Sequence, residues 1–305
     1  MLAQKSISTR AWGELFLLAM IWGASFVSIR IALDEIGPLT AVAHRVGWAA
    51  LVLWAVVFAL RLPLPRSPKL WAACLVMGLL NNVIPFGLMA WGQLHIESGL
   101  TSILNATTAI FGTLAAALFF ADERLTWAKA VGVSLGFFGV AVAIGLDTFA
   151  QFDLRSLAQL AVLGGTLFYA LAGVWARKRL SGLAPQVAAA SMVTGAAMIM
   201  LPLAWVVEGP LRLDLTARTG AAIAYYAVIS TALAYLLYYR VLAAAGSGNL
   251  MLVTLLVPPF AIVLGAVLLN EALQGAAYSG FALLALGLVI LDGRLWRRLR
   301  QSAKQ

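Results

Sequence analysis

The chain is poor in charge, in cysteine and in histidine. Charged residues make up 11% of its 305 residues and hydrophobic residues 63%, against about 25% and 45 to 50% in a soluble domain. This balance excludes a soluble globular protein and indicates a chain that lies mostly in a membrane. One cysteine and two histidines cannot build a disulfide framework or a thiolate metal cluster. We therefore expect no metal site, no cofactor and no catalytic residues.

The sequence also lacks the motifs of membrane-embedded enzymes that modify lipid or prenyl substrates. Such chemistry needs clustered carboxylates or histidines, usually with a metal, and no D-D-x-x-D, H-x-x-x-x-D or H-E-x-x-H pattern occurs. Basic residues inside the apolar segments are equally scarce, since Arg45 alone lies within one. Phosphate recognition needs several buried Lys or Arg residues, so polyanions such as sugar phosphates are poor candidates as ligands.

What the chain does contain is a series of apolar segments of about 20 residues, each long enough to cross a hydrocarbon core of about 30 Å. Turn signals such as Gly37-Pro38 and Gly246-Ser247-Gly248 separate them. We predict an all-α integral membrane protein of ten transmembrane helices, with spans near Trp12 to Leu33, Pro38 to Leu60, Pro68 to Trp91, Ser98 to Phe120, Thr126 to Leu146, Leu157 to Lys178, Pro185 to Val207, Thr219 to Tyr239, Gly248 to Leu269 and Gly275 to Trp296.

The net charge of +9 is explained by orientation in the membrane, because basic residues are retained on the cytoplasmic face. Sixteen Lys and Arg residues lie on the side of the N-terminus, and the opposite side has four, namely Arg30, Arg155, Arg212 and Arg218. Both termini are therefore predicted to be cytoplasmic. Nucleic acid, the usual partner of a basic soluble protein, is not expected.

A repeat organises the chain. The stretch from Glu123 to Gly139 returns 148 positions later between Glu271 and Gly287. The residues that recur are Glu123, Leu125, Ala128, Gly132, Leu135 and Gly139. Each copy holds five predicted spans, an odd number, so the second copy must enter the membrane from the opposite face. We predict two inverted repeats, residues 1–149 and 150–305, an arrangement typical of transporters with a binding site near the midplane.

These features resemble the drug/metabolite transporter superfamily, as two tandem EamA-type units. The resemblance rests on Trp22-Gly23 in the first span, Pro38 followed by Arg45 in the second, and the repeated Glu-x-Leu and glycine pattern. It implies a multi-pass exporter in the bacterial inner (cytoplasmic) membrane, with helices one to four and six to nine around a central cavity. Helices five and ten would lie outside that cavity.

Within the superfamily, exporters of the YddG type, which carry aromatic and other neutral amino acids, are the nearest match. The implied activity is secondary transport by alternating access, and the implied partners are a small-molecule substrate and membrane lipid, with the protein a monomer or a homodimer. Two alternatives stay open: an exporter of another small metabolite or drug within the superfamily, and a membrane-embedded lipid-modifying enzyme.

Polar residues at mid-depth are the candidate ligands, because a polar group in lipid without a partner is costly. Arg45 lies about 10 Å along its helix from the outer end at Pro38. It either pairs with Asp34 or Glu35 or attracts the carboxylate of an amino acid. Asn81 and Asn82 should face the interior, as ligands or as an interhelical hydrogen bond. The predicted substrate-binding residues are Trp22, Ser25, Arg45, Asn81, Asn82, Trp91, Asn105, Tyr169, Trp175 and Tyr235.

Four prolines inside spans are the predicted hinges about which the two halves would rock: Pro85, Pro202, Pro258 and Pro259. A proline removes a helical hydrogen bond and frees a carbonyl. The fourth span departs from the family pattern, since it reads Thr107-Thr108-Ala109-Ile110 where a proline is common. The two halves are therefore not expected to bend equally.

Several other features are interpreted as structural. Glu123 and Glu271 precede spans and are expected to cap helix N-termini rather than to carry protons. The face through Gly132 and Gly139 is expected to pack within the monomer rather than to form a dimer contact. Thr231, like the other threonines, is expected to bond its own helix backbone.

Carboxylates are missing from mid-depth, the nearest being Glu14 and Glu97 close to span ends. No buried acid relay is therefore expected, and uniport is at least as consistent with the sequence as proton antiport.

Overall fold

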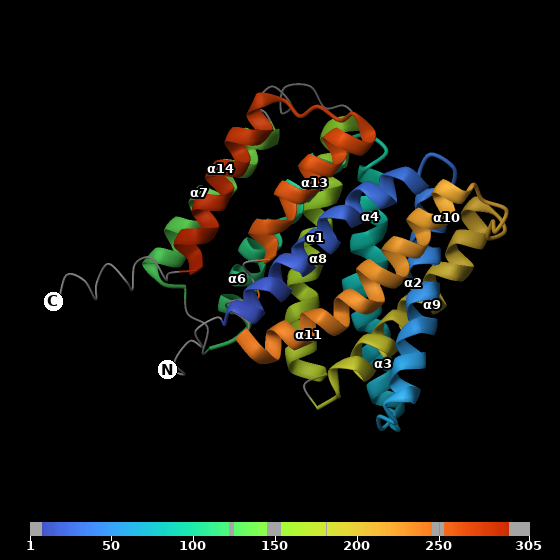
Figure 1. The fold of residues 1–305 in the computed structure, drawn as a ribbon. Helices are drawn as coiled ribbons and strands as arrows, with labels where there is room; N and C mark the ends of the chain where they lie inside the picture. The colour runs from blue at the N-terminus through green and yellow to red at the C-terminus, as the bar shows by residue number, and fades with distance from the viewer. Residues whose placement is uncertain are drawn as a thin grey trace.

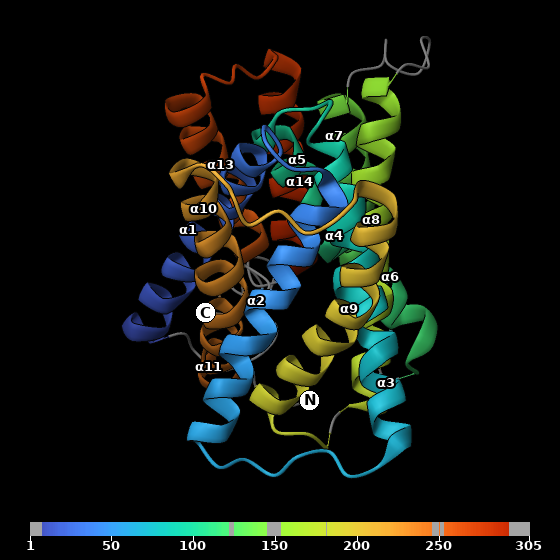
Figure 2. The ribbon, with the colours of Figure 1, turned by 90° about the vertical axis from the view of Figure 1, so that its right-hand side faces the viewer.

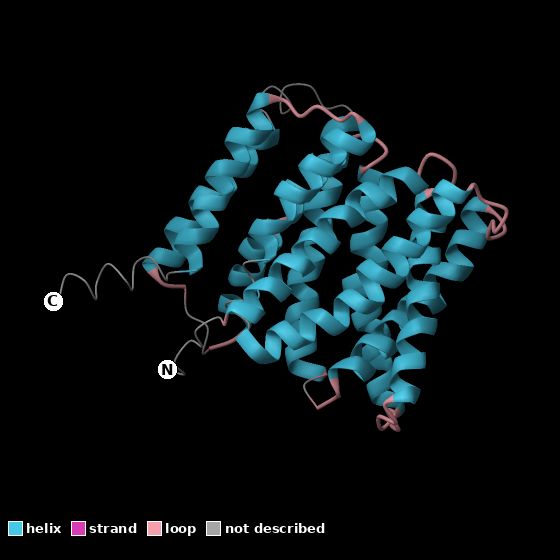
Figure 3. Ribbon diagram, in the orientation of Figure 1, coloured by secondary structure: helices cyan, strands magenta, loops and turns pink. Residues whose placement is uncertain are grey.

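The computed structural model describes residues 8–121, 125–144, 154–180, 182–245, 250 and 253–292, and this part of the chain is helical without strands. Figures 1 and 3 show the helices lying alongside one another. Their bounds are α1 Thr9–Ala32, α2 Pro38–Ala59, α3 Pro68–Gly78, η1 Leu79–Val83, α4 Ile84–Gly92, α5 Ser98–Asn105, α6 Thr108–Phe119, α7 Trp127–Ile144, α8 Leu154–Arg179, α9 Pro185–Glu208, α10 Ala217–Ala224, η3 Tyr225–Leu233, α11 Ala234–Ala245, α13 Val253–Leu269 and α14 Gly275–Asp292.

Seven helical segments in the described ranges are long and apolar enough to cross a membrane. Three shorter apolar helices accompany them: Lys129–Ala143, Leu256–Leu269 and Gly275–Ile290. The predicted all-helical membrane protein is confirmed at this level. Three predicted span ends, Leu146, Gly248 and Trp296, lie outside the described residues.

Proline sets where several helices begin. Pro38, Pro68 and Pro185 open α2, α3 and α9. Proline suits the first turn because the N–H that it lacks would have no helical partner there and its fixed φ is already helical. The predicted starts of these three spans coincide with the observed ones for this reason.

The most extensive helix contacts join the first half of the chain to the second. Helix α2 packs along α9, α1 along α13, α4 and α6 against α8, and α7 along α14. Figure 2 shows α2 running across α9 near the centre of the bundle. The two halves therefore interlock rather than forming two separate bundles.

Glycine allows α7 and α14 to approach at backbone distance. A Cβ atom added at Gly139 would lie 2.5 Å from the backbone nitrogen of Leu284, and one at Gly280 would lie 2.3 Å from that of Ala143. In lipid, where no hydrophobic effect drives helices together, such close packing is a main source of association. The prediction that the glycine face packs within the monomer is confirmed, and Figure 1 shows this pair at one side of the bundle, beside α13.

Glycine allows the same close approach in two other helix pairs that join the halves. A Cβ at Gly23 of α1 would lie 2.6 Å from the Cβ of Phe260 in α13, and one at Gly78 of α3 would lie 2.5 Å from the carbonyl oxygen of Met192 in α9. The Trp22-Gly23 pair singled out in the sequence thus marks the crossing of α1 with α13.

Carboxylates link the halves at the far end of the bundle, where α1 finishes and α2 begins. Glu208 accepts hydrogen bonds from the backbone nitrogens of Leu39 (2.9 Å) and Thr40 (2.8 Å) at the start of α2. Glu35 accepts from the backbone nitrogen (3.1 Å) and hydroxyl (2.7 Å) of Thr216, which precedes α10. Each carboxylate satisfies free N–H groups of a helix from the other half.

Glu271 forms the third link of this kind. It accepts from the backbone nitrogen (3.0 Å) and hydroxyl (2.6 Å) of Ser98, at the start of α5. Glu271 caps a helix N-terminus, as expected, but the helix is α5 and not the span that follows Glu271. Just before that span, Asn270 has a positive φ of 53° and the nitrogen of Glu271 donates to the carbonyl of Gly265. Glu123 lies outside the described residues.

The α7–α14 contact leads to a first prediction. Gly139→Leu should lower the apparent melting temperature in detergent by about 5 °C or more, since overpacking costs about 1 to 3 kcal/mol or more. Gly112→Leu is the control, because no atom lies within 4 Å of a Cβ at that position. Equal melting temperatures for the two variants would contradict the close contact.

The Glu271 link leads to a second. Glu271→Ala leaves the N-terminus of α5 without its acceptor and should destabilise the fold by about 1 to 3 kcal/mol. Asp214→Ala is the control: this carboxylate is 84% exposed and lies 3.6 Å from Arg212, an exposed pair worth about 0 to 1 kcal/mol. Thermal unfolding followed by tryptophan fluorescence would measure both, and a Glu271→Ala variant as stable as the control would refute the link.

Candidate functional site

A buried group of polar side chains lies where α2, η1, η3 and α11 meet. We call it the polar cluster, and its members are Arg45, Asn81, Asn82, Tyr226, Ser230, Thr231 and Tyr235. Arg45, on α2, is only 8% exposed, and its Nε donates to Thr231 Oγ1 at 2.9 Å. Its guanidinium lies 3.9 Å from the centre of the Phe86 ring, a cation–π contact. The cluster therefore brings together side chains from both halves of the chain.

Two π-helical segments place most of these side chains. Segment η1 holds Asn81 and Asn82, and η3 holds Tyr226, Ser230 and Thr231. A π-helix inserts an extra residue into a turn and is frequent at functional sites. The two segments occupy corresponding places in the halves, because Ser230 follows Asn82 by 148 positions, the offset of the repeat.

The sequence analysis missed both π segments and the role of Thr231. The hydroxyl of Thr231 donates to the carbonyl of Tyr226 at 2.7 Å, as expected of a threonine, but it also accepts from Arg45. Shifting Asn82 by the repeat offset would have pointed to Ser230 and its neighbour. Pro85, the predicted hinge, follows η1 within two residues, where the helix returns to α geometry.

Asn81 and Asn82 face the interior, as predicted, and both meet Tyr235. The Nδ2 atoms of Asn81 and Asn82 donate to the Tyr235 hydroxyl at 3.2 and 3.3 Å. Asn81 also lies 3.5 Å from the sulfur of Met192 on α9. The interhelical hydrogen bond foreseen for these amides is thus present, and it joins the third span to the eighth.

Arg45 has no carboxylate partner among the described residues. The pairing with Asp34 or Glu35 is wrong, because Asp34 accepts from Arg30 at 2.7 Å and Glu35 is bonded to Thr216. Both acidic residues stay in the connection beyond α1. The terminal nitrogens of Arg45 therefore have no hydrogen-bond acceptor within the described ranges.

Three further atoms of the polar cluster are buried without a hydrogen-bond partner in the described structure: Asn82 Oδ1, Tyr226 Oη and Ser230 Oγ. Such an atom costs about 1 to 3 kcal/mol, so each one calls for a water or a ligand. Partnerless oxygens of Gln93, Asn105, Gln159 and Ser191 lie on other elements. The polar cluster thus offers N–H donors at Arg45 and free oxygens nearby.

Two more predicted ligands border the polar cluster. Trp22 donates from its indole nitrogen to the carbonyl of Ser230 at 3.2 Å. The ring of Tyr169 meets Phe86 edge-on, with centroids 6.4 Å apart, and Phe86 in turn lies against the guanidinium of Arg45. Aromatic surfaces therefore lie beside the polar groups.

The remaining predicted ligands are not brought to the polar cluster. The hydroxyl of Ser25 donates to its own helix at the carbonyl of Trp22 (2.7 Å), and Trp91 packs against His95 with ring centroids 5.0 Å apart. Trp175 donates to the carbonyl of Ala73 at 2.9 Å, which ties α8 to α3. These contacts give the two tryptophans packing roles.

The fourth span is broken without a proline. Helix α5 ends at Asn105 and α6 begins at Thr108. The hydroxyls of Thr107 and Thr108 donate to carbonyls three residues back, each at 2.7 Å, and such bonds compete with the helical ladder. The fourth span is thus broken although it lacks a proline. Unequal bending of the halves stays a prediction, because residues 248–249 and 251–252 of the predicted ninth span lie outside the described residues.

The other predicted hinge prolines lie inside unbroken helices. Helix α13 continues through Pro258 and Pro259, and α9 continues through Pro202. Pro202 is exposed and Pro258 is buried.

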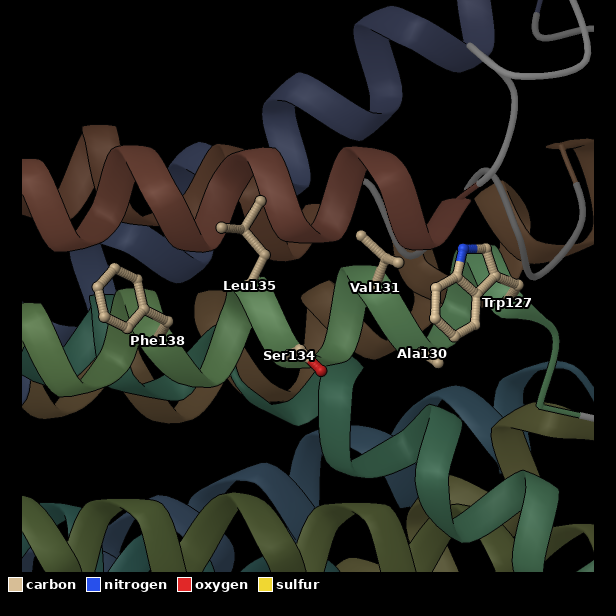
Figure 4. A pocket seen from close by; sticks show the side chains of 6 residues that line it. All are labelled: Trp127, Ala130, Val131, Ser134, Leu135 and Phe138. Carbon is tan, nitrogen blue, oxygen red and sulfur yellow. The ribbon is translucent and has the colours of Figure 1, made fainter.

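A pocket of about 410 Å³ lies elsewhere, along α7. Its lining is apolar except for one hydroxyl, and consists of Trp127, Ala130, Val131, Ser134, Leu135 and Phe138 (Figure 4). Trp127 is 83% exposed and Phe138 60%, so this surface faces outward. None of the predicted ligands lines it.

Comparison with known proteins decides the family. The model of the EamA-like transporter family matches the chain twice, at residues 11–145 and 156–291. The chain belongs to the EamA-like transporter family. It is a multi-pass membrane transporter, not an enzyme.

Curated relatives in this family are named as exporters. A "Probable terminal-alkyne amino-acid exporter" of Streptantibioticus cattleyicolor is 28% identical over 97% of this chain and 98% of its own length. Proteins named "Probable amino-acid metabolite efflux pump" are 28% identical in Salmonella typhimurium (90% of this chain, 92% of theirs) and 26% in Escherichia coli (92% and 95%). A solved crystal structure has a TM-score of 0.68 at 18% identity, covering 96% of this chain and 100% of its own, which shows that the two share a fold.

Proposed function

We propose that the protein is a secondary transporter that exports small neutral metabolites, foremost aromatic and other neutral amino acids, across the bacterial inner membrane by alternating access. One observation carries the proposal: Arg45 is buried in a span with no carboxylate partner in the described structure. A buried charge in a membrane protein normally has a partner or faces a substrate path. The carboxylate of an amino acid would complete it, and relatives named as amino-acid exporters support this substrate class.

The architecture that we propose has ten spans in two inverted repeats, 1–149 and 150–305, with cytoplasmic termini. The contacts between the halves and the corresponding positions of η1 and η3 support it. In such transporters the site lies between the repeats and one repeat moves against the other. The polar cluster fits this plan because Arg45 comes from the first half and Thr231 from the second.

The carboxylates nearest to mid-depth are neutralised. Glu14 is paired with both Arg10 and Arg240, and Glu97 lies 2.8 Å from Arg155. Both carboxylates thus hold ion pairs close to span ends, and neither belongs to the polar cluster. We therefore expect uniport down the gradient.

The flux assay tests function and coupling together. Purified protein in liposomes should show saturable uptake of radiolabelled phenylalanine or another neutral amino acid, with liposomes lacking the protein as the control. An imposed pH gradient without a substrate gradient should produce no accumulation. Accumulation under that condition would overturn uniport, and absence of flux for every amino acid would overturn the substrate class.

Substitution at Arg45 separates a binding role from a structural one. Arg45→Met removes a charge whose insertion costs about 2.5 to 3.5 kcal/mol, so thermal stability should be unchanged or raised. Transport should nevertheless fall at least about tenfold, because a hydrogen bond to a charged group is worth about 1.5 to 3 kcal/mol. Arg30→Met is the control, since Arg30 pairs with Asp34 away from the polar cluster. An Arg45→Met protein that is destabilised but transports normally would show a structural role.

A further inference from the structure

We propose that the polar cluster recognises both charged ends of an α-amino acid: Arg45 and Tyr235 bind the carboxylate, and the side-chain oxygen of Asn82 binds the ammonium group. The inference rests on the proposed function and specifies which part of the substrate the site reads. It follows from the hydrogen-bonding capacity that remains at each of the three side chains.

Tyr235 has only its proton left to offer. A phenol oxygen can accept two hydrogen bonds and donate one. Both acceptor positions are used by the Nδ2 atoms of Asn81 and Asn82, at 3.2 and 3.3 Å. The Tyr235 proton has no acceptor among the described residues, so it is free to donate to an anionic group.

Arg45 supplies a positive charge beside this donor, and the combination favours a carboxylate as the bound group. Its Nε is held by Thr231 at 2.9 Å, which fixes the guanidinium and leaves its terminal N–H groups available. Tyr235 follows Thr231 by four residues on the same span, about one helical turn, so the two side chains lie on one face. A carboxylate accepts paired N–H donors from arginine and has lone pairs left for a phenol, so the two side chains form one binding point.

Asn82 supplies a hydrogen-bond acceptor, whereas Arg45 and Tyr235 supply donors. Its side chain is 0% exposed, and the bond from Nδ2 to Tyr235 fixes the orientation of the amide. Oδ1 is therefore turned away from Tyr235, and it has no partner in the described structure. An ammonium group has three donors and no acceptor, which is the complement of a buried carbonyl oxygen.

Two further oxygens of η3 also lack a hydrogen-bond partner among the described residues. Ser230 Oγ and Tyr226 Oη are also buried and partnerless in the described part of the chain, and both belong to η3, the segment that carries Thr231. The surroundings of the cluster are Phe86, Tyr169 and Met192, which are uncharged, and methionine adapts to varied shapes. We therefore expect the site to select for the α-amino and α-carboxylate groups of an amino acid and to accept varied side chains.

The test compares phenylalanine with two derivatives that each lack one charged end. In proteoliposomes, unlabelled phenylalanine, N-acetylphenylalanine and phenylalaninamide compete with radiolabelled phenylalanine. Each derivative should compete about 10- to 100-fold more weakly than phenylalanine, the effect of losing hydrogen bonds to a charged group. N-acetylphenylalanine or the amide competing as well as phenylalanine would overturn the inference while leaving amino-acid export intact.

Two variants test which residue binds each charged end of the substrate. Asn82→Leu should weaken phenylalanine but not N-acetylphenylalanine, so that discrimination between them falls at least about tenfold. Tyr235→Phe should weaken both of these carboxylates more than the amide, which loses only the hydrogen bond that orients Asn82. Tyr225→Phe is the control, because Tyr225 donates to the carbonyl of Ile21 and should keep the wild-type ratios.

Each remaining outcome has a definite meaning. If the relative strengths of the three competitors are unaltered in Asn82→Leu, Asn82 does not bind the ammonium group. If they are unaltered in Tyr235→Phe, Tyr235 does not bind the carboxylate. If a variant does not fold, the wild-type comparison of the three competitors still decides. Absence of phenylalanine flux, together with absence of flux for every other amino acid, would overturn both the function and this inference.

Discussion

Close packing between the two halves of the chain is the constraint on which the rest of the structure depends. In a membrane the helices gain little from hydrophobic burial, so they associate through backbone proximity and interhelical hydrogen bonds. Gly139 and Gly280 provide that proximity for α7 with α14, and Gly23 does so for α1 with α13. Because these contacts cross from one half to the other, neither half has a complete set of partners by itself.

The same constraint places the polar cluster. Helix α2 of the first half packs on η3 of the second, and this contact brings Arg45 to Thr231, while η1 brings Asn82 to Tyr235. Every hydrogen bond that a described side chain of the polar cluster makes to a side chain of another span therefore joins the halves. A rearrangement of one half against the other changes the site, and a ligand that prefers one arrangement shifts the population toward it. In a transporter with this arrangement, substrate binding would therefore be coupled to the side of the membrane from which the site is accessible.

Hydropathy predicted the seven long apolar segments and proline the starts of three of them, because both act locally: an apolar run of sufficient length can cross the membrane, and Pro38 or Pro185 suits the first turn of a helix. Asn82 was predicted to face inward because an amide in lipid needs a partner. The π segments could not be predicted in this way, since one extra residue in a turn rotates all later side chains without changing composition. The sequence could not show that Trp22 lies beside the polar cluster while Trp91 and Trp175 do not, because a tryptophan in a span packs equally well in either place.

If the halves move as proposed, the carboxylate links at the far end are the contacts between them that can open most readily. Glu208, Glu35 and Glu271 bond the free N–H groups of helices from the opposite half, and hydrogen bonds at a helix end can be exchanged for water where the end is accessible. Glycine contacts such as that of Gly139 have no such substitute, because separating the backbones leaves an unfilled gap. Motion between the halves would therefore break the carboxylate links at the ends first and keep the glycine crossings as pivots. An exporter built this way would open at its polar ends while its apolar crossings stay packed.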